Sequence, residues 1–268
     1  MTHAGIDSTR PNVARIYDYL LGGIESYAAD REKAADLLRI CPSLGIVALE
    51  NRFLLARAVA WAAGQGMTQF IDLGAGMPVL KARAGVLEEI HVTAQAASPT
   101  ARVAYVDNDP LILARSRVFR ARASGVAVSA ADLTDPESVL ADLDLRAVID
   151  LARPACFIFG LVLGLIPATN ARDVVAGYLR RAAPGSYVVI SSVRCDDEAL
   201  WAKLSKAYTA ADVHNHTPAE IEGFLDGLET VSLGVVPAHG WRGGSHDAPA
   251  TPPGPVYVLA GVARKPAA

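Results

Sequence analysis

The sequence contains little cysteine. Cys41, Cys156 and Cys195 lie far apart, and no two of them form a C-x-x-C pair. This spacing argues against a disulfide-stapled scaffold and against a zinc site, so we expect no bound metal, and it favours a reducing compartment. A nucleophilic role for one cysteine stays open, although buried spectator cysteines are far commoner.

Long apolar runs and an apolar leader are also missing. The longest apolar run, residues 155–168, is too short to span a bilayer and is typical of a buried strand followed by a loop. The polar segment 1–12 lacks the apolar stretch of a signal peptide. We therefore expect a cytoplasmic protein with no membrane partner.

An excess of charge of one sign is absent as well. The net charge is -3, and lysine is scarce among the basic residues. This balance gives no electrostatic argument for binding nucleic acid or an anionic membrane. With 51% hydrophobic and 20% charged residues, the chain can bury a sizeable core. The expected partner is a small molecule, and a homodimer stays open.

The most informative stretch is a predicted strand, Gln69–Leu73, that runs into a glycine turn. Gly74 and Gly76 have no Cβ, which lets backbone N–H groups approach a ligand closely. A dinucleotide fingerprint needs a third glycine where this chain has Val79. A carboxylate, Asp72, also precedes the turn, where a phosphate would be unfavourable. This favours a cationic, phosphate-free nucleoside such as S-adenosylmethionine, although a turn without a ligand is the simpler alternative.

Strand patterns alternate with helix patterns along most of the chain, which indicates an α/β fold. A mostly parallel sheet with helices on both faces follows from such alternation. The last two strands are joined by loop alone and predict an antiparallel edge hairpin. The seven predicted strands are residues 69–73, 102–106, 126–130, 156–162, 186–192, 231–236 and 256–262.

Acidic residues fall at the ends of three successive predicted strands. Asp72, Asp107 and Asp132 would therefore meet where ligands bind in open parallel sheets, at the carboxyl ends of the strands. An acid ending the second strand can accept both ribose hydroxyls, and Asp132 with Leu133 can meet an adenine ring. Each acid by itself is more often a turn residue or a helix cap, but their occurrence together favours the nucleoside.

Before the first strand the chain is helical in pattern. Apolar residues recur at helix spacing over 13–20, a Gly22-Gly23 pair interrupts the run, and amphipathic helices follow over 28–40 and 46–63. The pair, rimmed by Tyr17 and Asp18, is compatible with a hinged lid over a site and equally with a helical hairpin on the domain's flank.

The candidate residues for chemistry fall into two groups. A general base is needed only if the acceptor is protonated at the working pH. The candidate bases are His91, His214, His216, Tyr17 and Asp18, although His214 and His216 precede a helix cap and fit a surface loop better. Arg15, Arg31 or Arg52 can hold a substrate carboxylate, or can form salt bridges within the helical segment.

Several motifs together resemble one known family. They are residues 14–23 (ARIYDYLLGG), 29–32 (ADRE), 50–54 (ENRFL), 57–59 (RAV), 72–78 (DLGAGMP), 106–110 (VDNDP), 130–133 (AADL), 217–221 (TPAEI), Phe224, 226–228 (DGL) and Trp241. In these the chain resembles the class I S-adenosylmethionine-dependent methyltransferases, in particular an actinobacterial subfamily with a helical N-terminal extension. The resemblance extends from Arg10 over nearly the whole chain.

The resemblance implies a Rossmann-like fold and S-adenosylmethionine as co-substrate. Residues 1–66 would form the helical extension or lid, and residues 67–268 the Rossmann-like domain. Tyr17, Asp18 and His91 are the predicted catalytic residues. The predicted contacts with S-adenosylmethionine are Gly22, Asp72, Gly74, Gly76, Asp107, Asn108, Asp132, Leu133 and Gly160.

The chain departs from the subfamily pattern in two places. The segment that follows the glycine loop is delayed and keeps only His91 and Gln95 of the pattern, and the loop after the fourth strand reads Gly164-Leu165-Ile166-Pro167-Ala168 without the usual His and Asp. The second loop would face the transferred group.

Four functions therefore stay open at this point. The first is methyl transfer to a small molecule, for instance in specialised metabolism. The second is attack on the aminocarboxypropyl arm of S-adenosylmethionine, by a substrate or within the molecule itself, releasing methylthioadenosine. The third is a non-catalytic S-adenosylmethionine-binding module, and a nicotinamide oxidoreductase is a distant fourth because the third glycine is missing.

Overall fold

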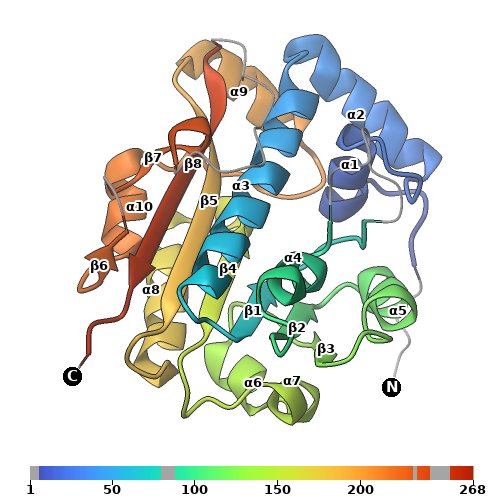
Figure 1. Cartoon of the computed structure of the whole chain (residues 1–268). Coiled ribbons are helices and arrows are strands. Elements are labelled where there is room, and N and C mark those ends of the chain that lie inside the picture. The colour runs from blue at the N-terminus through green and yellow to red at the C-terminus, as the bar shows by residue number, and fades with distance from the viewer. Residues whose placement is uncertain (1–5, 80–87, 232–233, 242–253, 268) are drawn as a thin grey trace.

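The computed structural model describes residues 6–79, 88–231, 234–241 and 254–267. Within them a single sheet has the strand order β3-β2-β1-β4-β5-β8-β6, and the short β7 also pairs with β8 (Figure 1). Strands β1 to β5 are parallel, and β8 runs antiparallel to β5. The strands are β1 (Gln69–Leu73), β2 (Arg102–Asp107), β3 (Val126–Ala130), β4 (Cys156–Gly160), β5 (Tyr187–Cys195), β6 (Glu229–Thr230), β7 (Val236–Pro237) and β8 (Val256–Arg264).

Helices surround this sheet. The α-helices are α1 (Val13–Leu20), α2 (Ala28–Ile40), α3 (Leu44–Gly64), α4 (Ile90–Ala97), α5 (Pro110–Phe119), α6 (Pro136–Ala141), α7 (Leu143–Val148), α8 (Ala168–Arg181), α9 (Glu198–Ala207) and α10 (Pro218–Phe224), and η2 (Val162–Leu165) and η3 (Ala238–Gly240) are short 3-10 helices. The class I methyltransferase fold expected from the sequence is confirmed, with its mostly parallel sheet and antiparallel edge.

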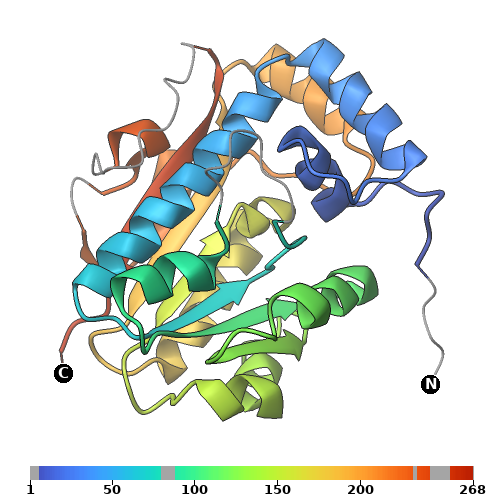
Figure 2. The same ribbon diagram turned by 45° about the vertical axis from the view of Figure 1, so that its right-hand side comes forward.

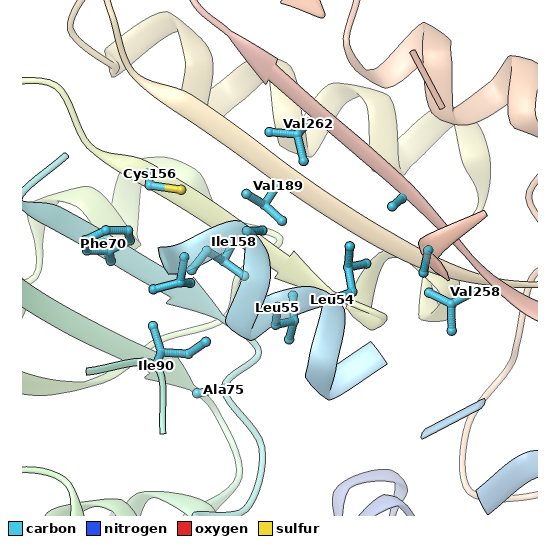
Figure 3. Packing of buried hydrophobic residues seen from close by; sticks show 14 of the residues in the cluster. Leu54, Leu55, Phe70, Ala75, Ile90, Cys156, Ile158, Val189, Val258 and Val262 are labelled. Carbon is cyan, nitrogen blue, oxygen red and sulfur yellow. The ribbon is translucent and has the colours of Figure 1, made fainter. Parts of the chain in front are cut away.

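The two faces of the sheet carry two separate hydrophobic clusters. Along β1, Phe70 belongs to one cluster and Ile71 to the other, as the alternation of side chains in a strand requires. On the first face α3 lies across the sheet, with Leu54 and Leu55 in the same hydrophobic cluster as Ile158 and Val258 (Figure 3). Helices α8 and α10 supply much of the second cluster. The central strands are buried on both faces, which explains their nearly continuous apolar sequence.

The helix signals in the sequence are confirmed at the residue level. Asp109 caps α5, with Pro110 at the first helical position, and Asp135 caps α6. Thr217 and Glu220 form the capping box of α10. These caps are local interactions between neighbours in sequence, so a local pattern is sufficient to predict them.

The edge of the sheet differs from the prediction. Part of the expected strand over 231–236, residues 232 and 233, lies outside the described residues. The described strands here are the two-residue β6 and β7, which both pair with β8. The sheet therefore has eight described strands at seven positions rather than seven continuous strands. Gly234 has φ of +85°, in the middle of the predicted strand, a backbone conformation that is incompatible with a continuous strand.

The fourth strand is also shorter than predicted. It ends at Gly160, and the apolar residues 162–165 form the 3-10 helix η2 instead of continuing the strand. Leu161, between them, has φ of +61° and is the one non-glycine residue with positive φ among the described residues. An apolar run alone cannot distinguish a strand from a buried turn of helix.

Helix α3 connects the N-terminal helices with the sheet. Its residues Leu54, Ala58 and Ala62 are fully buried in the same cluster as the sheet residues. The division of the chain at residue 66 stays a prediction, because α3 belongs to the core of the sheet as well as to the predicted extension. Within the described residues, no helix is both long and apolar enough to cross a membrane.

Candidate functional site

A cavity of about 540 Å³ opens at the carboxyl ends of the parallel strands. Its floor includes Asp72 on β1, Asp107 on β2 and Gly160 on β4. The strand order reverses at β1, since β2 and β3 lie on one side of it and β4 and β5 on the other. A ligand site at this switch point is the general rule for open α/β sheets. Helices α1, α2 and α9 lie together beyond these strand ends and close the cavity (Figure 2).

The structure brings nearly all of the predicted cofactor contacts to this cavity. Its lining includes Asp72, Gly74, Gly76, Asp107, Asn108, Asp132, Leu133 and Gly160. Gly22 is the exception: it follows α1 with φ of +80° and is not part of the lining. Its place in the sequence motif is explained by the turn, which needs a residue with positive φ.

The charge of the lining is strongly negative. Among its described residues are four aspartates, Asp72, Asp107, Asp109 and Asp132, and Arg52 is its one arginine, with no lysine. Burial raises the pKa of Asp72 to about 6, although Arg120 and Arg52 counteract the effect. Four carboxylates suit a ligand that carries a positive charge and hydroxyl groups, and they are unfavourable for a phosphate.

Asp107 organises the glycine loop as well as the end of β2. Its two carboxylate oxygens accept hydrogen bonds from the backbone N–H groups of Gly76 and Asp109, each at 3.0 Å. Burial nevertheless raises the pKa of Asp107. Each carboxylate oxygen has a second lone pair, so Asp107 can still accept hydroxyl hydrogen bonds from a ligand.

Both glycines of the loop have a positive φ, and one of them is required for packing as well. A Cβ on Gly74 would lie 2.6 Å from Val162 Cγ2, so a side chain there would displace η2. A Cβ on Gly76 would meet nothing within 4 Å, but φ of +61° disfavours any residue with a side chain. Gly74, with φ of +73°, is therefore needed both for packing and for the course of the backbone, and Gly76 for the course of the backbone alone.

Arg120, which the sequence did not indicate, holds this loop from beneath. Its Nη1 donates to Gly76 O at 2.9 Å, and its Nη2 donates to Ala75 O and Met77 O, both at 3.3 Å. Its Nε donates to Glu89 Oε2 at 2.9 Å. One guanidinium thus binds three successive carbonyl groups of the loop and one carboxylate.

The environment of Arg120 explains how a buried cation is tolerated. Arg120 is 1% exposed, and its guanidinium lies over the ring of Tyr105 at 4.3 Å from the centroid. The Arg120 guanidinium lowers the pKa of Glu89 despite the burial of that carboxyl, so the pair is charged. Glu89 Oε1 in turn accepts from Val79 N at 2.5 Å. We name these two residues, Arg120 and Glu89, the loop clamp.

A second network connects the N-terminal helices with β5. Asn51 Nδ2 donates to the Tyr17 hydroxyl at 2.8 Å, and that hydroxyl donates to Ala48 O at 3.1 Å. Ser191 Oγ donates to Asn51 Oδ1 at 2.6 Å and accepts from Leu161 N at 3.0 Å. The network thereby supports Leu161 in its strained conformation at the cavity wall.

The three predicted catalytic residues lie in different surroundings. Tyr17 lines the cavity, and burial raises its pKa. Asp18 is not part of the lining: its carboxylate accepts from Glu25 N at 2.9 Å, and a Cβ on Gly23 would lie 2.0 Å from its Oδ1. The Asp-x-x-x-x-Gly spacing is thus explained by a carboxylate packed against a glycine.

His91 is likewise outside the lining of the cavity. Its backbone N–H and its Nδ1 both contact the Tyr105 hydroxyl at 2.9 Å, and it is 7% exposed. Burial lowers the pKa of His91, which keeps the ring neutral near pH 7. Its described contacts give it a packing role beneath the glycine loop.

Of the three candidate arginines, only Arg52 lines the cavity. Arg15 forms a buried ion pair with Asp30 at 2.7 Å, and Arg31 donates to Ser26 O. Arg52 Nη2 donates to Glu88 O at 2.9 Å, and its charge lowers the pKa of Asp72. The first two are therefore structural residues of the N-terminal helices.

His214 lines the cavity, whereas His216 is buried behind it. The two imidazole rings are stacked at 6.1 Å, and His216 Nε2 lies 3.0 Å from Ile166 O. The backbone N–H of His214 donates to Gly164 O, so the segment 213–216 is attached to η2. The expectation of a surface loop is wrong for His216, which is 2% exposed.

Comparison with known proteins places the chain in context. Residues 1–266 match the family model described as S-adenosyl methyltransferase. A solved candidate methyltransferase from Thermobifida fusca YX shares 36% identity, covers 98% of each chain and superposes with a TM-score of 0.87. A protein of the DUF574 family from Streptomyces avermitilis shares 32% identity, covers 98% of this chain and 100% of its own, and superposes with a TM-score of 0.89.

More distant structures support the fold alone. Human N-acetylserotonin methyltransferase, solved with S-adenosylmethionine, shares 12% identity, covers 97% of this chain and 64% of its own, and has a TM-score of 0.51. No functionally curated protein matches the chain.

Proposed function

The chain belongs to the S-adenosyl methyltransferase family, and we propose that it transfers a methyl group to a small molecule bound in the cavity at the strand ends. Family membership makes the protein an S-adenosylmethionine-dependent methyltransferase with S-adenosylmethionine as its co-substrate. The observation that carries the small-molecule proposal is a cavity of about 540 Å³ that joins the aspartate-rich strand ends to an apolar wall. Its size is typical of small-molecule sites.

The residues at the strand ends fit the co-substrate. S-adenosylmethionine carries a sulfonium, an ammonium, a ribose and an adenine, and it supplies an activated methyl group. We assign Asp107 to the ribose hydroxyls, and Asp132 with Leu133 to the adenine. The buried carboxylate of Asp72 and the loop that contains Gly74 and Gly76 are assigned to the cationic methionine part, because a carboxylate whose pKa is raised by burial gains from a nearby cation.

The contribution of the protein to such a reaction is mainly alignment and exclusion of water. A displacement at a sulfonium needs the nucleophile, methyl carbon and sulfur in line. The loop clamp holds the glycine loop of the cavity, and the Tyr17–Asn51–Ser191 network connects its helical wall with β5. We propose that both serve this alignment.

The family assignment favours methyl transfer over attack on the aminocarboxypropyl arm and over a non-catalytic binding module. In the sequence, the apolar loop over residues 164–168, which has no acidic residue, favours the first alternative. Gly164, Leu165 and Ile166 of this loop line the cavity together with His214, so a candidate base is present beside the loop from another part of the chain. The missing acidic and histidine residues in the loop itself therefore give no argument against methyl transfer.

The test is titration calorimetry with S-adenosylmethionine and S-adenosylhomocysteine, followed by mass spectrometry of the recovered ligand and of a panel of small acceptors. We expect both ligands to bind and S-adenosylhomocysteine to appear together with a methylated acceptor. Release of methylthioadenosine would replace methyl transfer with attack on the aminocarboxypropyl arm. Absence of binding at millimolar ligand would contradict the assignments of Asp72, Asp107 and Asp132.

A further inference from the structure

The two ends of the cavity differ in chemistry. The four aspartates lie on β1 and β2 and on the segments that follow β2 and β3, and Arg52 lies on α3, at the end assigned to the co-substrate. The opposite end is formed by α2, the start of α3, and α9, which pack against one another (Figure 1). We define the apolar lobe as Leu37, Leu44, Val47, Trp201, Leu204 and Tyr208, all of which line the cavity.

The apolar lobe contains no charged side chain. Leu37, Val47 and Leu204 are buried members of the main hydrophobic cluster, and Trp201 and Tyr208 pack against it. Burial raises the pKa of Tyr208, which is therefore uncharged at any physiological pH. An ionised acceptor would have to lose its hydration here with no opposite charge beside it, which is costly. The two aromatic rings and the leucines instead suit a flat apolar molecule.

His214 provides a polar group on the cavity wall. Its ring stacks on His216, which is held by Ile166 O, and its backbone is held by Gly164 O. Within the described residues, no hydrogen bond to either ring nitrogen of His214 is present. An imidazole that is fixed in place but not hydrogen-bonded to the protein is available to a ligand.

We propose that the apolar lobe binds an uncharged aromatic hydroxy compound and that His214 accepts its hydroxyl proton. This proposal rests on the methyl transfer proposed above. The bond between the acceptor oxygen and the methyl carbon forms as the methyl–sulfur bond breaks, and the electron pair of that bond remains on sulfur. The hydroxyl proton passes to His214 and then to water, so the products are a methyl ether, S-adenosylhomocysteine and one proton.

Calorimetry with three probes tests the chemistry of the lobe. 2-Naphthol, 2-naphthoate and 2-naphthyltrimethylammonium share one ring system and differ in charge, and each is titrated with and without S-adenosylhomocysteine. We expect 2-naphthol to bind more tightly than either charged probe by about tenfold or more. Equal or tighter binding of a charged probe, or failure of 2-naphthol to bind, would overturn the proposal.

Two variants of α9 locate the binding site. Trp201→Arg places a cation in the lobe and should reverse the preference toward 2-naphthoate. Ala202→Arg adds the same charge on the same helix at an exposed position, and it should leave the preference unchanged. Circular dichroism and the affinity for S-adenosylhomocysteine are the checks that both variants are folded. If a folded Trp201→Arg variant still prefers 2-naphthol over the charged probes, the probes bind outside the apolar lobe.

The role of His214 has a readout that does not depend on turnover. In protein with labelled imidazole nitrogens, 2-naphthol should shift the His214 signals, which are identified by their loss in His214→Asn. Unshifted His214 signals at saturating 2-naphthol would remove His214 from the proposal. Failure of S-adenosylhomocysteine to bind would contradict the proposed function instead. The titrations of the three probes in the absence of S-adenosylhomocysteine would still test the chemistry of the apolar lobe.

Discussion

Asn12 Nδ2 donates a hydrogen bond to Asp109 Oδ2 at 2.8 Å, although the two residues are 97 positions apart. Each also caps its own helix: Asn12 Oδ1 accepts from Ala14 N and Arg15 N, and Asp109 Oδ1 accepts from Leu111 N and Ile112 N. The hydrogen bond therefore joins the starts of α1 and α5 at the edge of the cavity, which both residues line. It is a direct polar connection between the N-terminal helices and the segment that follows β2.

Asn12→Asp tests this connection without removing the cap of α1, because aspartate caps helices as well as asparagine does. The substitution places two carboxylates in contact, so we expect weaker binding of S-adenosylmethionine and a loss of about 1–3 kcal/mol of unfolding free energy. The double variant Asn12→Asp/Asp109→Asn restores one donor and one acceptor. Calorimetry and urea unfolding that show no recovery in the double variant would contradict the importance of this hydrogen bond.

Arg120→Met should disrupt the loop clamp. The change leaves Glu89 buried without its cation and frees three carbonyl groups of the loop, which should cost about 3–5 kcal/mol of unfolding free energy. S-adenosylmethionine should bind at least tenfold more weakly for the same reason, by about 1.4 kcal/mol or more. Chemical denaturation and calorimetry give both values.

Arg117→Met is the matched control for the loop clamp, because Arg117 is exposed in the last turn of α5, the helix that Arg120 caps. It should change stability by less than about 0.5 kcal/mol. Combining Arg120→Met with Glu89→Gln removes the unpaired charge and should recover part of the stability but not the ligand affinity. If Arg117→Met and Arg120→Met lost similar amounts of stability and ligand affinity, the effect would come from α5 and not from the loop clamp.

Asp72→Asn should stabilise the ligand-free protein while it weakens ligand binding. The pKa of Asp72 is raised from 3.8 to about 6, so stability falls as pH rises through that window, where the folded protein still holds a proton that the unfolded chain has lost. At pH 7 the ionised group costs of order 3 kcal/mol, because each pKa unit corresponds to about 1.4 kcal/mol. The variant avoids this cost.

The pH dependence makes this prediction specific. The difference in Tm between Asp72→Asn and the unsubstituted protein should be largest at pH 7 and should narrow as pH falls below 6. The affinity of the unsubstituted protein for S-adenosylmethionine should fall over the same range, because protonation of Asp72 removes its attraction for a cation. A lower Tm of Asp72→Asn at pH 7 would show that Asp72 has a stabilising role in the ligand-free protein.

Gly23→Ala tests the structural role of Asp18. The new Cβ would lie 2.0 Å from Asp18 Oδ1, which should cost about 1–3 kcal/mol of unfolding free energy. The same substitution in an Asp18→Ala background should cost much less, since the obstructing carboxylate is gone. Gly223→Ala, where a Cβ meets nothing within 4 Å, is the control and should be neutral or stabilising. Equal costs of Gly23→Ala in both backgrounds would contradict this packing.

Several features of the fold could be predicted from local sequence patterns. Strands β1 and β3 begin and end at the predicted residues, and α2 does as well, because each is bounded by turn or cap residues adjacent in the sequence. Helix α9 was missed, and its residues Trp201 and Leu204 line the cavity together with Tyr208, which caps its C-terminus. Its strongest local signal is the Asp197 cap, which alone does not distinguish a helix start from a turn.

The sequence by itself determined the end of the sheet at which ligands would bind and the chemistry of that end. Asp72, Asp107 and Asp132 each follow or end a recognisable strand, and parallel strands bring their carboxyl ends to the same edge whatever else the fold contains. The glycine turn is equally local, since Gly74 and Gly76 are adjacent to the strand that precedes them. These features depend on neighbours in the chain, so a linear pattern is sufficient to predict them.

Only the tertiary structure decided which other side chains reach the site. Arg120 binds the loop from a helix 43–45 positions further along the chain, and Ser191 reaches Asn51 across 140 positions. His91 and Asp18 were reasonable candidates in the sequence, yet one packs under Tyr105 and the other against Gly23. Long-range contacts depend on how the helices dock on the sheet. The free energy of that docking comes from burial of apolar surface, which is not directional, so a sequence pattern does not specify which distant residues will meet.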